Sequence, residues 1–145
     1  MQLTTNFSLE EMIRSDAALR LGINNWPSST IQANLLLVAQ ALECVRTKLG
    51  GKPILVTSGY RCPSLNTAVG GAKDSAHMSG WAADFRCPEF GAPQEIVRFL
   101  AGQEVKFDQL IQEGTWVHLS VAPAMRQEVL TAHFAGGNVT YTEGV

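Results

Sequence analysis

The longest regular pattern in the chain is a run of apolar residues with helical spacing. Its members recur three or four positions apart: Ile31, Leu35, Val38, Leu42, Val45 and Leu49. This spacing places them on one face of an α-helix, and the Gly50-Gly51 pair that follows is typical of a helix end. The sequence therefore predicts a long core helix over residues 31–49.

Shorter patterns predict the other elements. Ser8 and Glu11 form a capping box that predicts the start of a short helix, and "PSLNTAVGG" and "APQEIVRFLAG" predict two more. The runs "PILVTSGY" and "GWAADF" predict strands, and "VKFDQLIQEGTWVHLSV" predicts two strands around a turn. "PAMRQEVLTAHFAGG" fits a last helix or an irregular segment, and residues 138–145 fit an edge strand or a frayed end.

This order of elements indicates the fold class. Helices come first and mostly strands follow, which is typical of α+β proteins rather than of alternating βαβ units. The 145 residues suit one domain with one hydrophobic core, and no repeat or second domain is visible. We expect a compact single domain over residues 1–145, with an antiparallel sheet packed against N-terminal helices.

Composition excludes several classes of function. The net charge of -2 argues against a nucleic-acid binder, which normally carries a basic face. No run is long enough to cross a bilayer, and "MQLTTNFSLEEM" lacks the basic and apolar regions of a signal peptide. We expect a monomer that neither binds nucleic acid nor inserts into a membrane.

The three cysteines form a poor disulfide framework because their number is odd. Cys44 falls within the long helical pattern and is expected in the core. Cys62 and Cys87 each lie in an "RCP" triplet. They could pair if the two loops touch, although two reduced thiols are favoured for a chain without a secretion signal.

The stretch "SAHMSGWAADF" carries candidate metal ligands. His77 and Asp84 lie seven residues apart among small residues, so they are either half of a metal site or an incidental pair. A catalytic zinc site usually has three protein ligands and an open position. His118, on a predicted strand beside Trp116, is the candidate third ligand, although a strand histidine is often structural.

Glu113, just before the turn between the last two predicted strands, is a candidate catalytic carboxylate. If Gly114-Thr115 is a two-residue type II′ turn, Ile111 pairs with His118 and Glu113 with Trp116, so all four share one face. Glu113 could then reach a water on a metal held by His118. It could equally be a solvated residue beside a turn.

Two further polar residues are candidates for the site or for the surface. Arg61 ends the predicted strand "PILVTSGY" and is either exposed or a bidentate grip on a substrate carboxylate. His133, in "TAHFAGG", has no partner pattern and is expected to be structural or on the surface.

With these residues collected, the sequence resembles a known family. "SAHMSGWAAD" fits a Ser-x-His-x-x-Gly-x-Ala-x-Asp pattern, "WVH" supplies a distal histidine, and "SGYRCPSLNTAVGGAKDSAH" resembles the segment before the motif. These features resemble the zinc D-alanyl-D-alanine carboxypeptidase-like enzymes, the M15 peptidases, over about residues 53 to 122.

The resemblance implies roles for the site residues. His77, Asp84 and His118 would be zinc ligands, and Arg61 would orient the substrate. Ser58 and Ser75 would line the site, and Trp116 would form a pocket wall or only pack in the core. The fold would be the one shared with the hedgehog signalling domain.

The chain departs from the family pattern at the catalytic acid. Many relatives carry it three residues before the distal histidine, where this chain has Thr115. Glu113, placed on the correct face by the turn, is the expected general base. Asp108 is the fallback, although strand alternation places it on the opposite face.

The implied function is a zinc metallopeptidase that cuts the stem peptide of peptidoglycan. The bond could be D-Ala-D-Ala, a D,D-crosslink or L-Ala-D-Glu, so carboxypeptidase and endopeptidase activities both remain open. The size fits a phage endolysin for cell wall degradation, delivered by a holin or within a virion. The alternatives are a non-catalytic zinc-binding module of the same fold and a metal-free fold.

Overall fold

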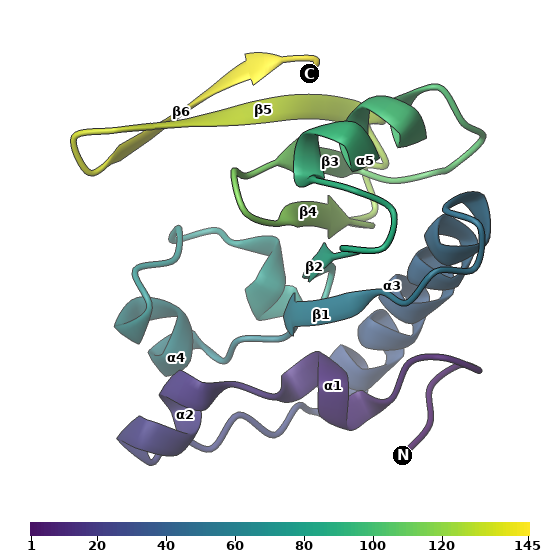
Figure 1. The fold of residues 1–145 in the computed structure, drawn as a ribbon. Helices are drawn as coiled ribbons and strands as arrows, with labels where there is room; N and C mark the ends of the chain where they lie inside the picture. Colours follow the sequence, from purple (N-terminus) through teal and green to yellow (C-terminus); the bar gives the residue numbers. More distant parts are fainter.

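A single six-stranded sheet organises the chain (Figure 1). The computed structural model describes residues 1–145. In space the strands follow the order β1-β2-β4-β3-β5-β6. Their bounds are β1 Leu55–Ser58, β2 Ala82–Arg86, β3 Gln109–Gln112, β4 Val117–Ser120, β5 Glu128–Ala135 and β6 Asn138–Glu143.

The chain also forms five α-helices and one 3-10 helix. They are α1 Leu9–Ile13, α2 Asp16–Leu21, α3 Ser29–Lys48, α4 Pro63–Ala68, η1 Ala76–Ser79 and α5 Pro93–Ala101. The predicted capping box is confirmed: Ser8 Oγ accepts from Glu11 N–H, and the Glu11 side chain accepts from Ser8 N–H. The predicted long helix is confirmed as α3. No helix is both long and apolar enough to span a bilayer.

The expectation for residues 123–137 is wrong, because most of this segment is the strand β5. β5 pairs in parallel with β3, with Ile111 opposite Leu130, so the sheet is mixed rather than wholly antiparallel. The tail forms the edge strand β6, which is one of the two expected alternatives. The α+β class and the single domain are as expected.

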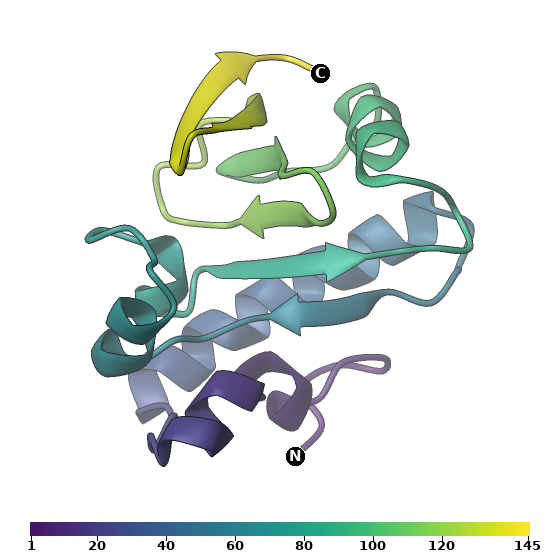
Figure 2. The ribbon, with the colours of Figure 1, turned by 60° about the vertical axis from the view of Figure 1, so that its left-hand side comes forward.

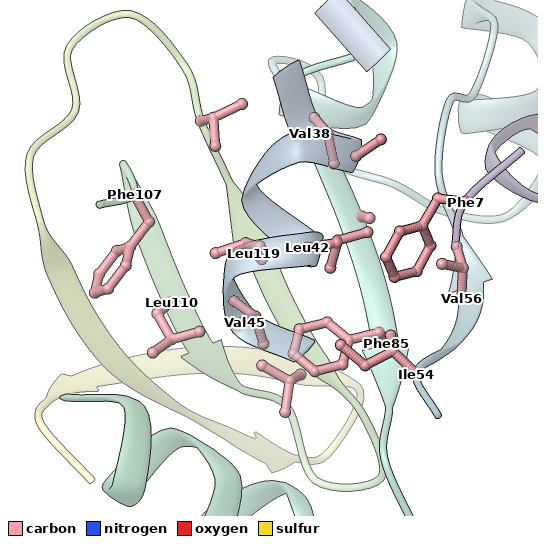
Figure 3. Packing of buried hydrophobic residues seen from close by; sticks show 14 of the residues in the cluster. Phe7, Val38, Leu42, Val45, Ile54, Val56, Phe85, Phe107, Leu110 and Leu119 are labelled. Atoms are coloured by element: carbon pink, nitrogen blue, oxygen red, sulfur yellow. The ribbon is translucent and has the colours of Figure 1, made fainter. Parts of the chain in front are cut away.

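The hydrophobic core lies between α3 and one face of the sheet (Figure 3). Val38, Leu42 and Val45 of α3 belong to the same buried cluster as Phe85 of β2 and Leu119 of β4. Because side chains alternate along a strand, the residues between these strand positions point to the other face. That face is therefore available for a functional site.

The cysteines are all free thiols. Cys87 is buried in the core and Cys62 is half-buried. Cys44 was expected in the core but is exposed, because it lies on the outer side of α3 between the inward-facing Leu42 and Val45.

The segment from α4 to η1 and the turn between β5 and β6 extend on the same side of the molecule in both ribbon views (Figure 2). The α4–η1 segment follows β1 in the chain, whereas β6 is the opposite edge of the sheet. The two segments therefore border the sheet face that α3 leaves uncovered.

Candidate metal centre

Hydrogen-bonded strand register places two of the three candidate ligands side by side. Asp84 of β2 is the direct partner of His118 of β4. On both strands the neighbouring residues, such as Phe85 and Leu119, point into the core, so Asp84 and His118 share the uncovered face. The sheet therefore fixes the relative position of these two side chains.

The third candidate, His77, comes from η1. Ser75 caps this short helix by accepting from His77 N–H, and Gly80 ends it with a left-handed backbone (φ 71°). A β-carbon at Gly80 would also lie 2.9 Å from the Ile31 side chain, so glycine is needed for both reasons. This tight connection turns the chain from His77 directly into β2.

The three side chains converge on one point. Asp84 Oδ1 lies 3.2 Å from His77 Nε2 and 3.0 Å from His118 Nδ1. The three ligand atoms lie within 4.8 Å of one another, and all three residues are buried. Two imidazoles and a carboxylate therefore form a cluster that could hold a metal ion.

The hydrogen bonding of His77 fits a metal ligand. Its Nδ1 lies 2.6 Å from the carbonyl oxygen of Gly59, which can only accept, so Nδ1 carries the proton. Nε2, the nitrogen facing Asp84, is then free to bind a cation, and such a carbonyl partner is common for metal-bound histidines. The donor set of two nitrogens and one carboxylate oxygen suits zinc.

Asp84 and His118 shift each other's pKa. Burial works to raise the pKa of Asp84, but His77 and His118 outweigh it and hold that pKa well below its usual range. Burial works to lower the pKa of His118, but the hydrogen bond and the charge of Asp84 outweigh it and raise that pKa. The buried Asp84 carboxylate thus faces two imidazoles. Its negative charge needs a positive charge nearby, either a proton on an imidazole or a metal cation between the three side chains.

Glu113 lies beside this cluster, at the turn between β3 and β4. The strand pairing is the predicted one, with Ile111 opposite His118, and Glu113 N–H donates to Trp116 C=O. The turn is not the expected type II′: Thr115 N–H donates to Glu113 C=O across Gly114 (φ 80°), the bond of a γ-turn. Glu113 Oε1 still lies 4.0 Å from His118 Nδ1.

The surroundings of Glu113 raise the pKa of its carboxyl group above the ordinary value for glutamate. Burial, together with the charge of Asp84, raises the pKa of the Glu113 carboxyl, although His118 and Arg61 counteract this. A carboxyl group with a raised pKa is better able to accept and release a proton near neutral pH.

Arg61 also reaches the cluster. Its backbone N–H donates to the carbonyl oxygen of His77, which ties the end of the β1 segment to η1. Its side-chain Nε is buried without a hydrogen-bond partner in the protein. Burial lowers the pKa of Arg61, and the nearby Asp84 and Glu113 oppose that shift.

A cavity of about 840 Å³ opens above the cluster. Ser75, Arg61, Glu113 and Trp116 all line it, and the buried Trp116 Nε1 lies close enough to the Glu113 carboxylate to lower its pKa. Ser58 does not line it, although Ser58 is the β1 residue paired with Asp84. The structure therefore brings together every candidate except Ser58.

Asp108 also lines the cavity, so its expected place on the opposite face is wrong. It precedes β3 rather than lying within it, and strand alternation does not extend to it. Its carboxylate accepts from Arg126 Nε at 2.9 Å and Arg126 Nη2 at 2.8 Å. Arg126 lowers the pKa of Asp108, which makes Asp108 a weaker base than Glu113.

The cavity residues after residue 120 were not predicted, although the Gly136-Gly137 pair is typical of a two-residue hairpin turn. Leu130 of β5 and Val139 and Tyr141 of β6 line the cavity, and so does Arg126, just before β5. Because β5 was not predicted, the pairing that brings these residues to the cavity was not predicted either. His133 lies on the exposed face of β5, where its Nε2 contacts Thr142 Oγ1, as expected for a surface residue.

Comparison with known proteins agrees with this geometry. Residues 5–120 match the family model described as Peptidase M15. A 79-residue stretch is 38% identical to the zinc D-Ala-D-Ala carboxypeptidase of Streptomyces albus G. The match covers 54% of this chain and 30% of that relative, so the chain spans under a third of the relative's length.

Proposed function

The chain belongs to the M15 peptidase family, and from this premise we propose that it is a zinc metallopeptidase. Its substrate would be the stem peptide of peptidoglycan, and its ligands would be His77, Asp84 and His118. The observation that supports this most is the buried convergence of these three residues at the base of an open cavity. A purely structural zinc site is normally closed by a fourth protein ligand, and this cluster has three.

Zinc, when bound, supplies a Lewis acid that activates water and polarises the scissile carbonyl. Glu113 then acts as the general base, taking the proton from the attacking water and passing it to the leaving amine. Its position beside His118 and its raised pKa both support this role. Glu113 directly follows β3, the strand next to β4, and so it approaches the metal centre from the side of β3.

Arg61 would hold the substrate through a carboxylate or carbonyl oxygen. Its buried Nε is a donor without a protein partner, and Arg61 lines the cavity. Buried donors normally have hydrogen-bond partners, so the free Arg61 Nε supports a ligand that brings an acceptor oxygen. Peptide substrates carry such acceptors at every residue and at the terminal carboxylate.

The bond that is cut is part of the proposal. The relative's name specifies D-Ala-D-Ala, and this dipeptide is the first substrate to test. A D,D-crosslink and the L-Ala-D-Glu bond are the other candidates. We further propose delivery to the cell wall through a holin or within a virion, as in a phage endolysin.

The test is digestion of defined muropeptides by the zinc-loaded protein, with products identified by mass spectrometry. Glu113→Gln keeps the shape of the side chain but removes the base, and it should lower kcat by about 10²- to 10⁴-fold. Zinc content should be unchanged. Glu104→Gln, at an exposed glutamate outside the cavity, is the matched control and should retain full activity.

Other outcomes would change the assignment. Unchanged hydrolysis by Glu113→Gln would remove Glu113 from its role as the base. A wild-type protein that binds zinc and cleaves none of the muropeptides would instead be a non-catalytic zinc-binding module. Thr115, at the position where many relatives carry the acid, is the feature that favours this second reading.

A further inference from the structure

The β5–β6 hairpin lies beyond the part of the chain that matches the family, yet it borders the cavity. The family match ends at residue 120, and the hairpin begins at Glu128. Three of its side chains line the cavity above the metal centre: Leu130, Val139 and Tyr141. The family match therefore does not account for this wall of the cavity.

Strand register explains why these side chains face the metal centre. One row of paired residues crosses the sheet, from Asp84 through His118 and Ile111 to Leu130. Paired residues share a face, so Leu130 lies on the same face as the ligands. Two positions further along β5, Ala132 pairs with Tyr141, which places Tyr141 on that face as well.

The tip of the hairpin is also tied to the turn that carries Glu113. Phe134 is paired with Val139, and its ring lies 3.6 Å from the position that a β-carbon on Gly114 would occupy. Gly114 directly follows Glu113 in the chain. The hairpin is therefore held close to the proposed base.

Tyr141 is the polar group that the hairpin contributes to the cavity. The side-chain hydrogen bonds within the hairpin join Thr131 to Gly144 and His133 to Thr142, and they leave the Tyr141 phenol without one. Burial and the negative charges of Glu113 and Asp84 raise the pKa of Tyr141. Tyrosine is protonated at neutral pH even without this shift, so the half-exposed phenol can donate a hydrogen bond to a ligand.

The two sides of the cavity differ in chemistry. Arg61 follows β1, at one edge of the sheet, whereas Tyr141 lies on β6, at the other edge. The ligand strands β2 and β4 lie between these edges. A peptide crossing the metal centre would thus meet a cation on one side and an aromatic and aliphatic surface on the other.

We propose that the β5–β6 hairpin is a substrate-binding wall in which Tyr141 donates a hydrogen bond to a backbone carbonyl of the peptide, on the side of the metal centre away from Arg61. Leu130 and Val139 provide an apolar surface for the side chain next to that carbonyl. This inference rests on the proposed peptidase function. It makes the hairpin a determinant of substrate length and sequence rather than of the chemical step.

The experiment measures kcat and KM for zinc-loaded protein on two substrates. One is the best muropeptide of the wild type, and the other is the shortest fragment that keeps the same scissile bond. Tyr141→Phe removes only the hydroxyl, and it should raise KM for the long substrate about three- to ten-fold with little change in kcat. Val139→Ser should also raise KM, because it makes the apolar surface polar. The short fragment should be unaffected.

Thr140→Ala is the matched control, because Thr140 lies on the opposite face of the same strand, paired with His133. It should leave both substrates unchanged. Zinc content and Tm, measured for every variant, separate binding effects from unfolding.

The inference is overturned if wild-type protein cleaves the long substrate and Tyr141→Phe does so with kcat/KM within twofold of wild type. An equal loss on the short fragment would also overturn it. A wild-type protein that cleaves neither substrate refutes the proposed function itself, and the inference falls with it. The two failures are therefore distinguishable.

Discussion

Metal removal is expected to destabilise the protein by an amount that depends on pH. A ligand that binds only the folded state stabilises it by about 2.7 kcal/mol when present at 100 times its Kd. For a chain of 145 residues, each kcal/mol corresponds to about 2–4 °C in Tm, so saturating zinc should raise Tm by about 5–10 °C at pH 7.5.

The pH dependence follows from His118. In the metal-free protein its pKa is raised, chiefly because the hydrogen bond and charge of Asp84 outweigh burial. A raised folded-state pKa stabilises the metal-free protein below the unfolded value of about 6.5, and this stabilisation is lost as pH rises through the folded pKa. Zinc must displace that proton, so the zinc-dependent gain should shrink by about 1.4 kcal/mol per pH unit below the folded pKa.

Differential scanning fluorimetry with zinc or with a chelator, at pH 5.5, 6.5 and 7.5, measures this gain directly. The Tm difference should increase with pH and level off once His118 is neutral in the metal-free protein. His118→Ala should abolish the difference, and His133→Ala, at an exposed histidine on β5, should retain it. The same difference at all three pH values, or its survival in His118→Ala, would refute the assignment of this site.

Three other substitutions test the surrounding structure. Phe85→Ala leaves a cavity in the core between β2 and α3, and urea unfolding should show a loss of about 3–5 kcal/mol. Gly59→Ala places a β-carbon 2.1 Å from the carbonyl oxygen of Met12, so Tm should fall. Because the Gly59 carbonyl orients His77, zinc titration should also show about 10- to 100-fold weaker binding. Asp108→Asn breaks the ion pair with Arg126 and should cost about 1–2 kcal/mol at pH 7. Because the pKa of Asp108 is lowered in the folded protein, the difference should start to shrink below about pH 4 and vanish only as pH falls through that lowered pKa.

The elements with strong local signals were predictable from the sequence. The capping box at Ser8 and the helical spacing around Leu42 act over a few residues, and both predicted helices are present. The pairing of Ile111 with His118 was also predictable, because a short turn fixes the register of a hairpin. The turn itself is a γ-turn, and this changes the local bonding around Gly114 without shifting that register.

β5 was not predicted because its apolar pattern is weak and only part of its pairing is local. The segment carries helix-favouring residues such as Met125 and Leu130, and the apolar side chains of Val129 and Leu130 fall on opposite faces of a strand. β5 pairs in parallel with β3, and parallel pairs are joined by long connections with no turn signal. Its other pairing, with β6, is local and is closed by the Gly136-Gly137 turn, which is a hairpin signal that the sequence interpretation missed. Missing β5 also hid the cavity wall that contains Tyr141.

Two of the three proposed metal ligands lie on central strands of the sheet, whereas the proposed substrate-binding wall lies at its edge, so the metal centre and the wall can change independently. Asp84 and His118 are 34 residues apart in sequence, but each occupies a central strand whose register is set by neighbours on both sides. Moving either ligand would require a register shift that exposes the core. The β5–β6 hairpin is paired to the rest of the sheet through β3 alone, and its outer strand is exposed along its length. Substitutions there disturb few buried contacts, so the substrate range can change while the metal centre stays intact.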